Sequence, residues 1–355
     1  MKRFCYSALL IAVTGGGAFF IGRQGLPKTG GGPDFLGMPA PVSLGKTLRV
    51  SDPVRQQAEF GRFLMGLSPE GAASEAHEVW SAPGEQQEIS ERKRLFCYAW
   101  GKVAGAAAVE FARKEPGVGK VAAISGALAG WASQDPQAAR QWISSRLEPG
   151  ERLLHTWALI DGWARHDPRA ATEYVLSFPN TPGVDRFIRS IAGEMVRVGG
   201  PAAADWAMAL PPGSLRQTGV EEVTGGWART APSPASDWAF ALQDSALATR
   251  AVDRAITEWA RADGIAAGGF LERQPASVIR DAAVSAYLAV LATEDLQAVS
   301  HWAKTIRNSS LREQSLRRIA DEWMARNPEA TLAWLPSSGL DAEAQKEIAT
   351  TGEPR

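Results

Sequence analysis

The side chains that could carry out catalysis are few and scattered along the chain. The histidines show no spacing typical of metal ligands; they are His77, His155, His166 and His301. Cys97 could act as a nucleophile only beside a base and a group that orients that base, and the sequence offers no third group for such a set. These residues are therefore expected to lie in the core or on the surface without a chemical role.

Two further short patterns resemble catalytic motifs without meeting their requirements. The segment 117–120 contains Gly and Lys, but it lacks the spacing of a phosphate loop, the following Ser or Thr and a preceding strand. Glu221 and Glu222 are adjacent on an expected helix, so they point in different directions and face solvent. The sequence thus predicts no catalytic, cofactor or metal site, and the protein is expected not to be an enzyme.

Arginine is the residue type that recurs with a spacing suited to binding. One set repeats at a constant interval near the expected C-terminal ends of helices, where a cation meets the negative end of the dipole: Arg165, Arg197, Arg229 and Arg261. A second set follows the expected turns, where the helix dipole is unfavourable: Arg152, Arg186, Arg216, Arg250, Arg280 and Arg312.

The second arginine set has two explanations at the level of sequence. The structural one is that each guanidinium bonds to turn carbonyls or to a neighbouring carboxylate. The functional one is a stripe that receives an acidic peptide, a phosphate or an anionic polymer, because guanidinium groups repeated along one face bind such partners in register. Both explanations require elements that place the arginines at a regular spacing.

Those elements are visible in the tryptophans, ten of which, out of thirteen, follow a 32-residue period. A large apolar residue holds one position in every period, at Trp131, Trp163, Met195, Trp227, Trp259, Leu291 and Trp323. A second position lies eleven residues further on, at Trp142, Tyr174, Trp206, Trp238, Phe270, Trp302 and Trp334. Seven copies run without insertion or deletion, and a shifted eighth copy is present at Trp100 and Phe111.

Each copy is predicted to form two helices joined by a turn. The first helix begins at an N-cap such as Asp135, and Pro136 then takes the first helical position, where proline costs no hydrogen bond. The second helix carries apolar residues at helical spacing, as in Val252, Ile256 and Trp259. No stretch of the repeated region has the alternation of a strand.

The tryptophans at the two repeated positions are expected to form the core, because small residues precede the second position by three and four residues on the same helix face. The alternative is a stacking surface for sugars or peptides. Trp80 and Trp157 lie outside both positions, and we expect these two to be the exposed tryptophans.

The pattern W-A-x-x-D-P-x-A-A-x-x-W of residues 131–142 resembles the tetratricopeptide-like and HEAT-like α-solenoids, although the tetratricopeptide Trp-Leu-Gly-Tyr pattern is absent. It is more similar to bacterial repeat proteins that carry this signature, many of which begin with an export segment. The resemblance covers about two thirds of the chain. It implies an all-α fold, a right-handed α-solenoid of about seven to eight helix-turn-helix repeats, which binds a partner and holds no catalytic residues.

Composition divides the chain into four parts. Residues 1–22 contain two basic residues and an uncharged run, which fits either an uncleaved membrane anchor or a cleaved signal peptide. Residues 23–51 form a linker, since ten of the 29 are Gly or Pro. Residues 52–102 are predicted to be degenerate helices, and residues 103–355 the repeats, closed by a polar C-terminal cap.

Both an anchor and a signal peptide would place the rest of the chain outside the cytoplasm. We therefore expect an envelope protein, either anchored in the inner membrane or periplasmic. A net charge of −1 over 355 residues argues against nucleic acid as partner, and membrane contact is expected only through the N-terminal segment. The expected function is a non-enzymatic scaffold for a protein or peptide, which is acidic if the arginines form a stripe. The alternatives are a structural spacer without a specific ligand and an all-α enzyme acting on envelope glycan or lipid.

Overall fold

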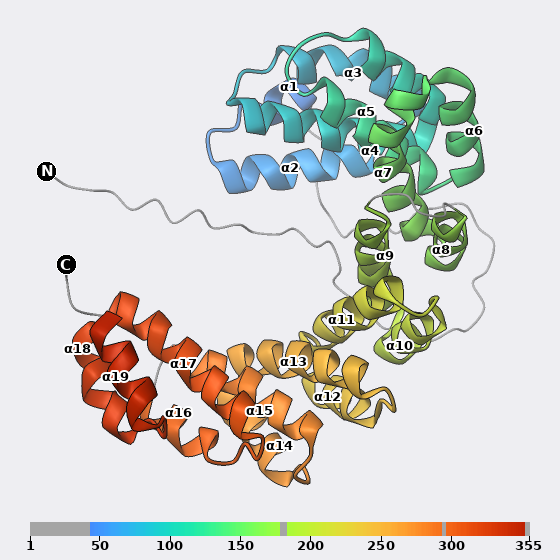
Figure 1. Ribbon diagram of the computed structural model, residues 1–355. Helices are drawn as coiled ribbons and strands as arrows, with labels where there is room; N and C mark the ends of the chain where they lie inside the picture. The colour runs from blue at the N-terminus through green and yellow to red at the C-terminus, as the bar shows by residue number, and fades with distance from the viewer. Residues whose placement is uncertain (1–42, 178–182, 293–295, 352–355) are drawn as a thin grey trace, which may run out of the picture. The chain divides into compact units, whose positions relative to one another are not determined.

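The computed structural model describes residues 43–177, 183–292 and 296–351. Within these ranges it contains nineteen α-helices, one short 3-10 helix and no β-strand (Figure 1). The all-α class expected from the sequence is therefore confirmed. The predicted anchor or signal segment, 1–22, and most of the predicted linker lie outside the described residues. Among the residues that are described, no helix combines the length and apolar character needed to cross a membrane.

From α5 onward, odd-numbered and even-numbered helices alternate in the way the sequence period predicts. The odd helices carry the first large apolar position near their C-terminal ends: α5 Lys120–Ala132, α7 Pro149–His166, α9 Val184–Val198, α11 Ser214–Ala228, α13 Ser245–Ala262, α15 Val278–Leu291 and α17 Ser309–Arg326. The even helices carry the second position: α6 Pro136–Arg146, α8 Pro168–Leu176, α10 Gly200–Ala209, α12 Pro232–Ala241, α14 Gly264–Arg273, α16 Leu296–Ala303 and α18 Pro328–Trp334.

The remaining elements precede and follow these pairs. They are α1 Leu44–Thr47, α2 Pro53–Met65, α3 Pro69–Ser81 and α4 Gln86–Lys114, and after α18 the 3-10 helix Leu335–Ser337 and α19 Ala342–Thr351. α1 falls inside the range 23–51 that composition marks as linker, and its Leu44 is fully buried, so helical packing begins there. α4 is longer than the helix expected up to residue 102, and it bends at Ala104, whose backbone is not helical.

The even helices α6, α8, α14 and α18 begin at the N-caps that the sequence predicts. A side-chain oxygen accepts a hydrogen bond from the backbone N–H three residues further on, over 2.9 to 3.1 Å, at Asp135, Asp167, Asp263 and Asn327. A proline follows each of these caps except Asp263 and occupies the first helical position. The cap fixes where each even helix starts, and hence the distance to its large apolar residue.

The two repeated positions are in ring contact inside the helix pairs that carry Trp131, Trp163, Trp227 and Trp259. Ring centroids lie 4.9 Å apart between Trp163 and Tyr174, and 5.2 Å apart between Trp259 and Phe270. None of the fourteen residues at these positions is exposed, which confirms that they form the core. The shifted copy behaves in the same way, with Trp100 and Phe111 5.0 Å apart.

The expectation that Trp80 and Trp157 are exposed is wrong. Both are half-buried, because each packs against an aromatic side chain from a different helix. The Trp80 ring lies 5.1 Å from Phe111, and the Trp157 ring lies 4.1 Å from Phe187. Their apolar neighbours are far away in sequence, so the repeat period gives no sign of them.

Each odd helix packs against its even partner and against the next odd helix. These contacts run from α5 to α7 and onward without interruption to α17, and α17 then packs against α19 (Figure 1). The odd helices therefore form a row in which neighbouring members belong to successive repeat units. Side chains on the exposed side of this row come together from residues that are one or two periods apart in the sequence.

Candidate functional site

Four arginines of the second predicted set bond to a backbone carbonyl at the C-terminal end of the preceding even helix or in the segment that follows it. Arg152, Arg216 and Arg280 each donate from Nε to one carbonyl oxygen, those of Leu147, Leu210 and Leu271, over 2.8, 2.8 and 3.1 Å. Arg312 donates from a terminal nitrogen to the Ile306 carbonyl oxygen over 3.0 Å. The same contact is thus made repeatedly between an odd helix and the even helix before it.

These bonds explain why a cation stands near a helix N-terminus, where its own helix repels it. The carbonyl groups at the end of a helix have no intrahelical partner and carry the negative end of the dipole. At Leu147 and Leu210, which directly follow α6 and α10, the guanidinium of the following odd helix supplies a donor near that negative end. Arg280, which is buried, also donates to the Thr305 carbonyl oxygen over 3.3 Å.

The other two arginines of this set have internal partners as well. The Arg186 guanidinium lies 4.8 Å from the centre of the Trp157 ring, and Arg250 forms an ion pair of 3.2 Å with Glu221. Each of the six arginines therefore contacts a different partner within the chain. The structure does not gather them into one cluster.

The first predicted arginine set forms ion pairs that link successive odd helices. Glu194 on α9 pairs with Arg165 from α7 at 3.8 Å and with Arg197 of its own helix at 2.7 Å. Glu258 on α13 repeats the arrangement two units later, at 3.6 Å from Arg229 and 3.9 Å from Arg261. These arginines are exposed, so the pairs contribute little to stability.

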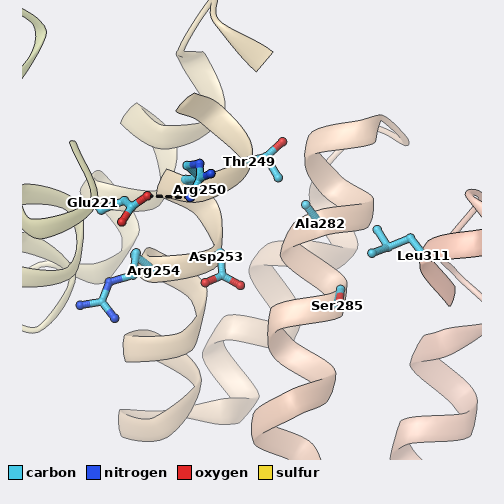
Figure 2. A pocket seen from close by; sticks show the side chains of 8 residues that line it. All are labelled: Glu221, Thr249, Arg250, Asp253, Arg254, Ala282, Ser285 and Leu311. Atoms are coloured by element: carbon cyan, nitrogen blue, oxygen red, sulfur yellow. Dashed lines mark hydrogen bonds and ion pairs between the residues drawn. The ribbon is translucent and has the colours of Figure 1, made fainter. Parts of the chain in front are cut away.

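A pocket of about 350 Å³ opens on the row of odd helices. Its lining comes from α11, α13, α15 and α17 (Figure 2): Glu221, Thr249, Arg250, Asp253, Arg254, Ala282, Ser285 and Leu311. Glu221, Asp253 and Ser285 occupy the same place in three successive repeat units. The repeat period therefore places the residues that line the pocket. What distinguishes the pocket from the rest of the row is the type of side chain at these equivalent positions.

Small side chains on α15 create this hollow. Arg250 on α13 corresponds to Ala282 on α15 in the next unit, and Arg254 corresponds to Ala286. The long side chains of α13 thus face a helix that presents Ala282 and Ser285 to the pocket. The local sequence predicts Glu221 on a solvated face and gives no sign of Asp253. A comparison of equivalent positions across the repeat units could have identified Glu221 and Asp253 as pocket residues.

The remaining candidate groups are separate from the pocket. Burial raises the pKa of the Cys97 thiol to about 12, so at neutral pH the group is protonated and a poor nucleophile. His155 is buried in α7, whereas His166 at the end of the same helix, His77 on α3 and His301 on α16 are exposed. Among the described residues, no three His, Cys, Asp or Glu side chains are placed to hold a metal ion.

Comparison with known proteins adds no relative: no family model matches the chain, and neither a curated protein nor a solved structure is significantly similar to it. The pocket and the row of odd helices are the features of the described residues that bear on function.

Proposed function

We propose that the protein is a non-enzymatic scaffold that binds a protein or peptide partner on the row of odd helices. The helix pairs form a right-handed α-solenoid of about seven to eight units. The partner lies across several units and contacts the surface around α11, α13, α15 and α17.

The observation that carries this proposal is the position of the pocket. Its walls come from four successive odd helices, and three of its residues are at equivalent places in consecutive units. A ligand that fills the pocket therefore continues onto neighbouring units that have the same backbone geometry. This suits an extended chain, whose own repeat of side chains can follow the row of helices.

The chemistry of the row supports a polypeptide partner better than a nucleic acid. Cations and anions alternate on it, as in the ion pairs of Glu194 and Glu258, and the chain has a net charge of −1. A nucleic-acid site needs an excess of cations over a continuous face. The six arginines of the second set belong to the proposed surface only where they border it, as Arg250 does.

The location proposed for this scaffold is the cell envelope. Residues 1–22, with their basic start and uncharged run, serve as an inner-membrane anchor or as a signal peptide that leaves a periplasmic protein. Membrane contact is limited to that segment.

A structural spacer without a specific ligand is the second candidate. The bonds from arginines to the preceding even helices favour it, because they stabilise the array and need no partner. The two candidates differ in one respect: a spacer has no preferred face, whereas a scaffold does.

Site-directed photocrosslinking in the native host separates the two candidates. The full chain carries p-benzoylphenylalanine in place of Ala282, in the pocket, or in place of the exposed Asp237 on α12 as the matched control. We expect discrete protein or peptide adducts from position 282 and none from position 237. Equal labelling from both positions, or no adduct from either, would refute the scaffold.

A further inference from the structure

The two arginines that line the pocket are both directed to its α11 side. Arg250 is held by its 3.2 Å ion pair with Glu221 on α11. Arg254 lies against Gly225 of α11, where a methyl group added to the glycine would stand 3.3 Å from a guanidinium nitrogen. Figure 2 shows the Arg250–Glu221 ion pair and the Arg254 guanidinium on the side of α13 that is remote from α15. Their positive charges are therefore withdrawn from the space between α13 and α15.

The two hydroxyl groups of the pocket have already used their protons. Thr249 donates to the Ser245 carbonyl oxygen over 2.8 Å. Ser315 donates to the Leu311 carbonyl oxygen over 2.7 Å, so in its 2.7 Å contact with Ser285 it must be the acceptor and Ser285 the donor. Thr249 and Ser285 consequently present only lone pairs to a ligand.

Asp253 supplies the negative charge between α13 and α15. Within the described part of the chain its carboxylate takes part in no hydrogen bond and no ion pair shorter than 4.0 Å, although it is exposed and accessible. Neighbouring helices remove part of the water around it, which raises the pKa of the carboxyl group, and Arg254 and Arg318 oppose this shift only through space. A partly dehydrated carboxylate without a partner binds a cation favourably.

The rest of this side of the pocket is apolar. Ala282 and Leu311 contribute aliphatic surface from α15 and α17, and Figure 2 shows the Leu311 side chain directed towards α15. An aliphatic wall next to hydrogen-bond acceptors matches a side chain that has a methylene stem and a head rich in donors. Lysine and arginine are the residues built in this way.

We propose that the pocket takes a lysine or arginine side chain of the peptide partner, with Asp253 pairing with its cationic head. Thr249 and Ser285 accept further hydrogen bonds from the ammonium or guanidinium group, and Ala282 and Leu311 contact the stem. This assignment rests on the proposed peptide-binding function and specifies which residue the partner must place at α13 and α15.

Selection from a random peptide library on the immobilised full chain tests the assignment. We expect the selected peptides to be enriched in a lysine or arginine at one position, and acetylation of that lysine to weaken binding roughly tenfold. Asp253→Asn should remove the preference, and Asp253→Lys should replace it with a preference for Asp or Glu. Asp237→Lys on α12 makes the same change of charge outside the row and should leave the preference intact.

The outcomes separate the assignment from the function on which it rests. If peptides bind without a basic preference, or keep it in Asp253→Lys, the pocket assignment is overturned while peptide binding stands. Failure to select any peptide overturns the proposed function together with the assignment. If 1,5-diaminopentane binds as tightly as the selected peptides and Asp253→Asn abolishes this binding, the source of the cation is a free diamine, and the peptide assignment is overturned.

Discussion

At the scale of single residues, hydroxyl groups on the even helices decide how tryptophans of the next even helix are held. Trp206 donates from Nε1 to the Thr172 hydroxyl over 2.9 Å, and Trp334 donates to the Ser300 hydroxyl over 2.8 Å. Ser236 holds the same place between them in the sequence, but the residue at the place of the donor is Phe270. Phenylalanine has no donor, and the Ser236 hydroxyl is buried without a hydrogen-bond partner in the described part of the chain.

This difference predicts opposite results for two otherwise identical substitutions. Ser300→Ala leaves the buried Trp334 N–H without an acceptor and should lower the free energy of unfolding by about 1–3 kcal/mol. Ser236→Ala removes a buried polar group that has no partner. It should change the free energy of unfolding by less than about 0.5 kcal/mol, or raise it. Urea unfolding of the two variants measures both values, and equal losses would contradict the explanation.

A second residue-scale prediction concerns His155, which is buried and whose Nδ1 has no partner among the described residues. Burial lowers its pKa below the ordinary value of 6.5, since the charged form is disfavoured, with Glu151 and Arg113 as the nearby charges. The unfolded chain therefore takes up the proton first, so stability is complete above pH 6.5 and declines as the pH falls through the folded-state pKa.

The measurement compares urea midpoints at pH 7.5 and pH 5.5. The unaltered protein should be less stable at the lower pH, and His155→Leu should lose part of that difference. A pH dependence that is unchanged in His155→Leu would show that other groups cause it.

At the scale of elements, glycines set the distance between α4, α5 and α7. A methyl group added to Gly101 or Gly130 would overlap a backbone carbonyl of the neighbouring helix, that of Ala127 or Tyr98 respectively. Gly162 on α7 lies equally close to the Ala129 carbonyl. The backbones of these helices therefore touch, and no side chain separates them.

Gly130→Ala should accordingly destabilise the protein by about 3 kcal/mol or more, because a backbone cannot move aside as a flexible side chain does. Gly193→Ala is the matched control, since Gly193 lies inside α9 with open space around it. Alanine is the better helix former, so this variant should gain about 0.5–1 kcal/mol. Thermal unfolding compares the two, and a loss below about 1 kcal/mol for Gly130→Ala would refute the close approach.

The bonds between helix ends give another prediction at this scale. Arg280 is buried and reaches both the Leu271 and the Thr305 carbonyl oxygens, so Arg280→Ala should cost about 2–4 kcal/mol. Arg273, exposed in the last turn of α14, makes no such bond within the described ranges, and Arg273→Ala should cost less than about 0.5 kcal/mol. Similar urea midpoints for the two variants would mean that the carbonyl contact is dispensable.

At the scale of the whole molecule, stability is distributed unevenly because each helix packs mainly against its neighbours. α5 has eight buried residues, whereas α2, which is equally long, has one, Phe60. Local opening of α2 therefore costs little. Hydrogen exchange should be at least about a hundredfold faster in α2 than in α5, and similar rates would indicate that the described helices open as a single cooperative unit.

The sequence predicts the structure well where a side chain acts on its own helix or on the next one. The caps at Asp135 and Asp167 and the core positions at Trp163 and Trp259 follow from local chemistry and from the period. The sequence predicts the structure less specifically where a contact depends on the distance between helices. The carbonyl that Arg280 reaches, the bend at Ala104 and the hollow at Ala282 depend on how far adjacent side chains extend, which one sequence position does not encode.

One arrangement of ion pairs repeats after two units instead of after every unit. Glu194 and Glu258, each paired with an arginine of the preceding odd-helix unit and with one three residues further on, stand two units apart, and the equivalent residue of the unit between them is Gly226. The apolar core is compatible with any number of helix pairs. Duplication of a single helix pair, however, would place two equivalent members of this arrangement in adjacent units. A gene duplication that preserves the ion-pair arrangement of Glu194 and Glu258 would therefore add four helices at a time.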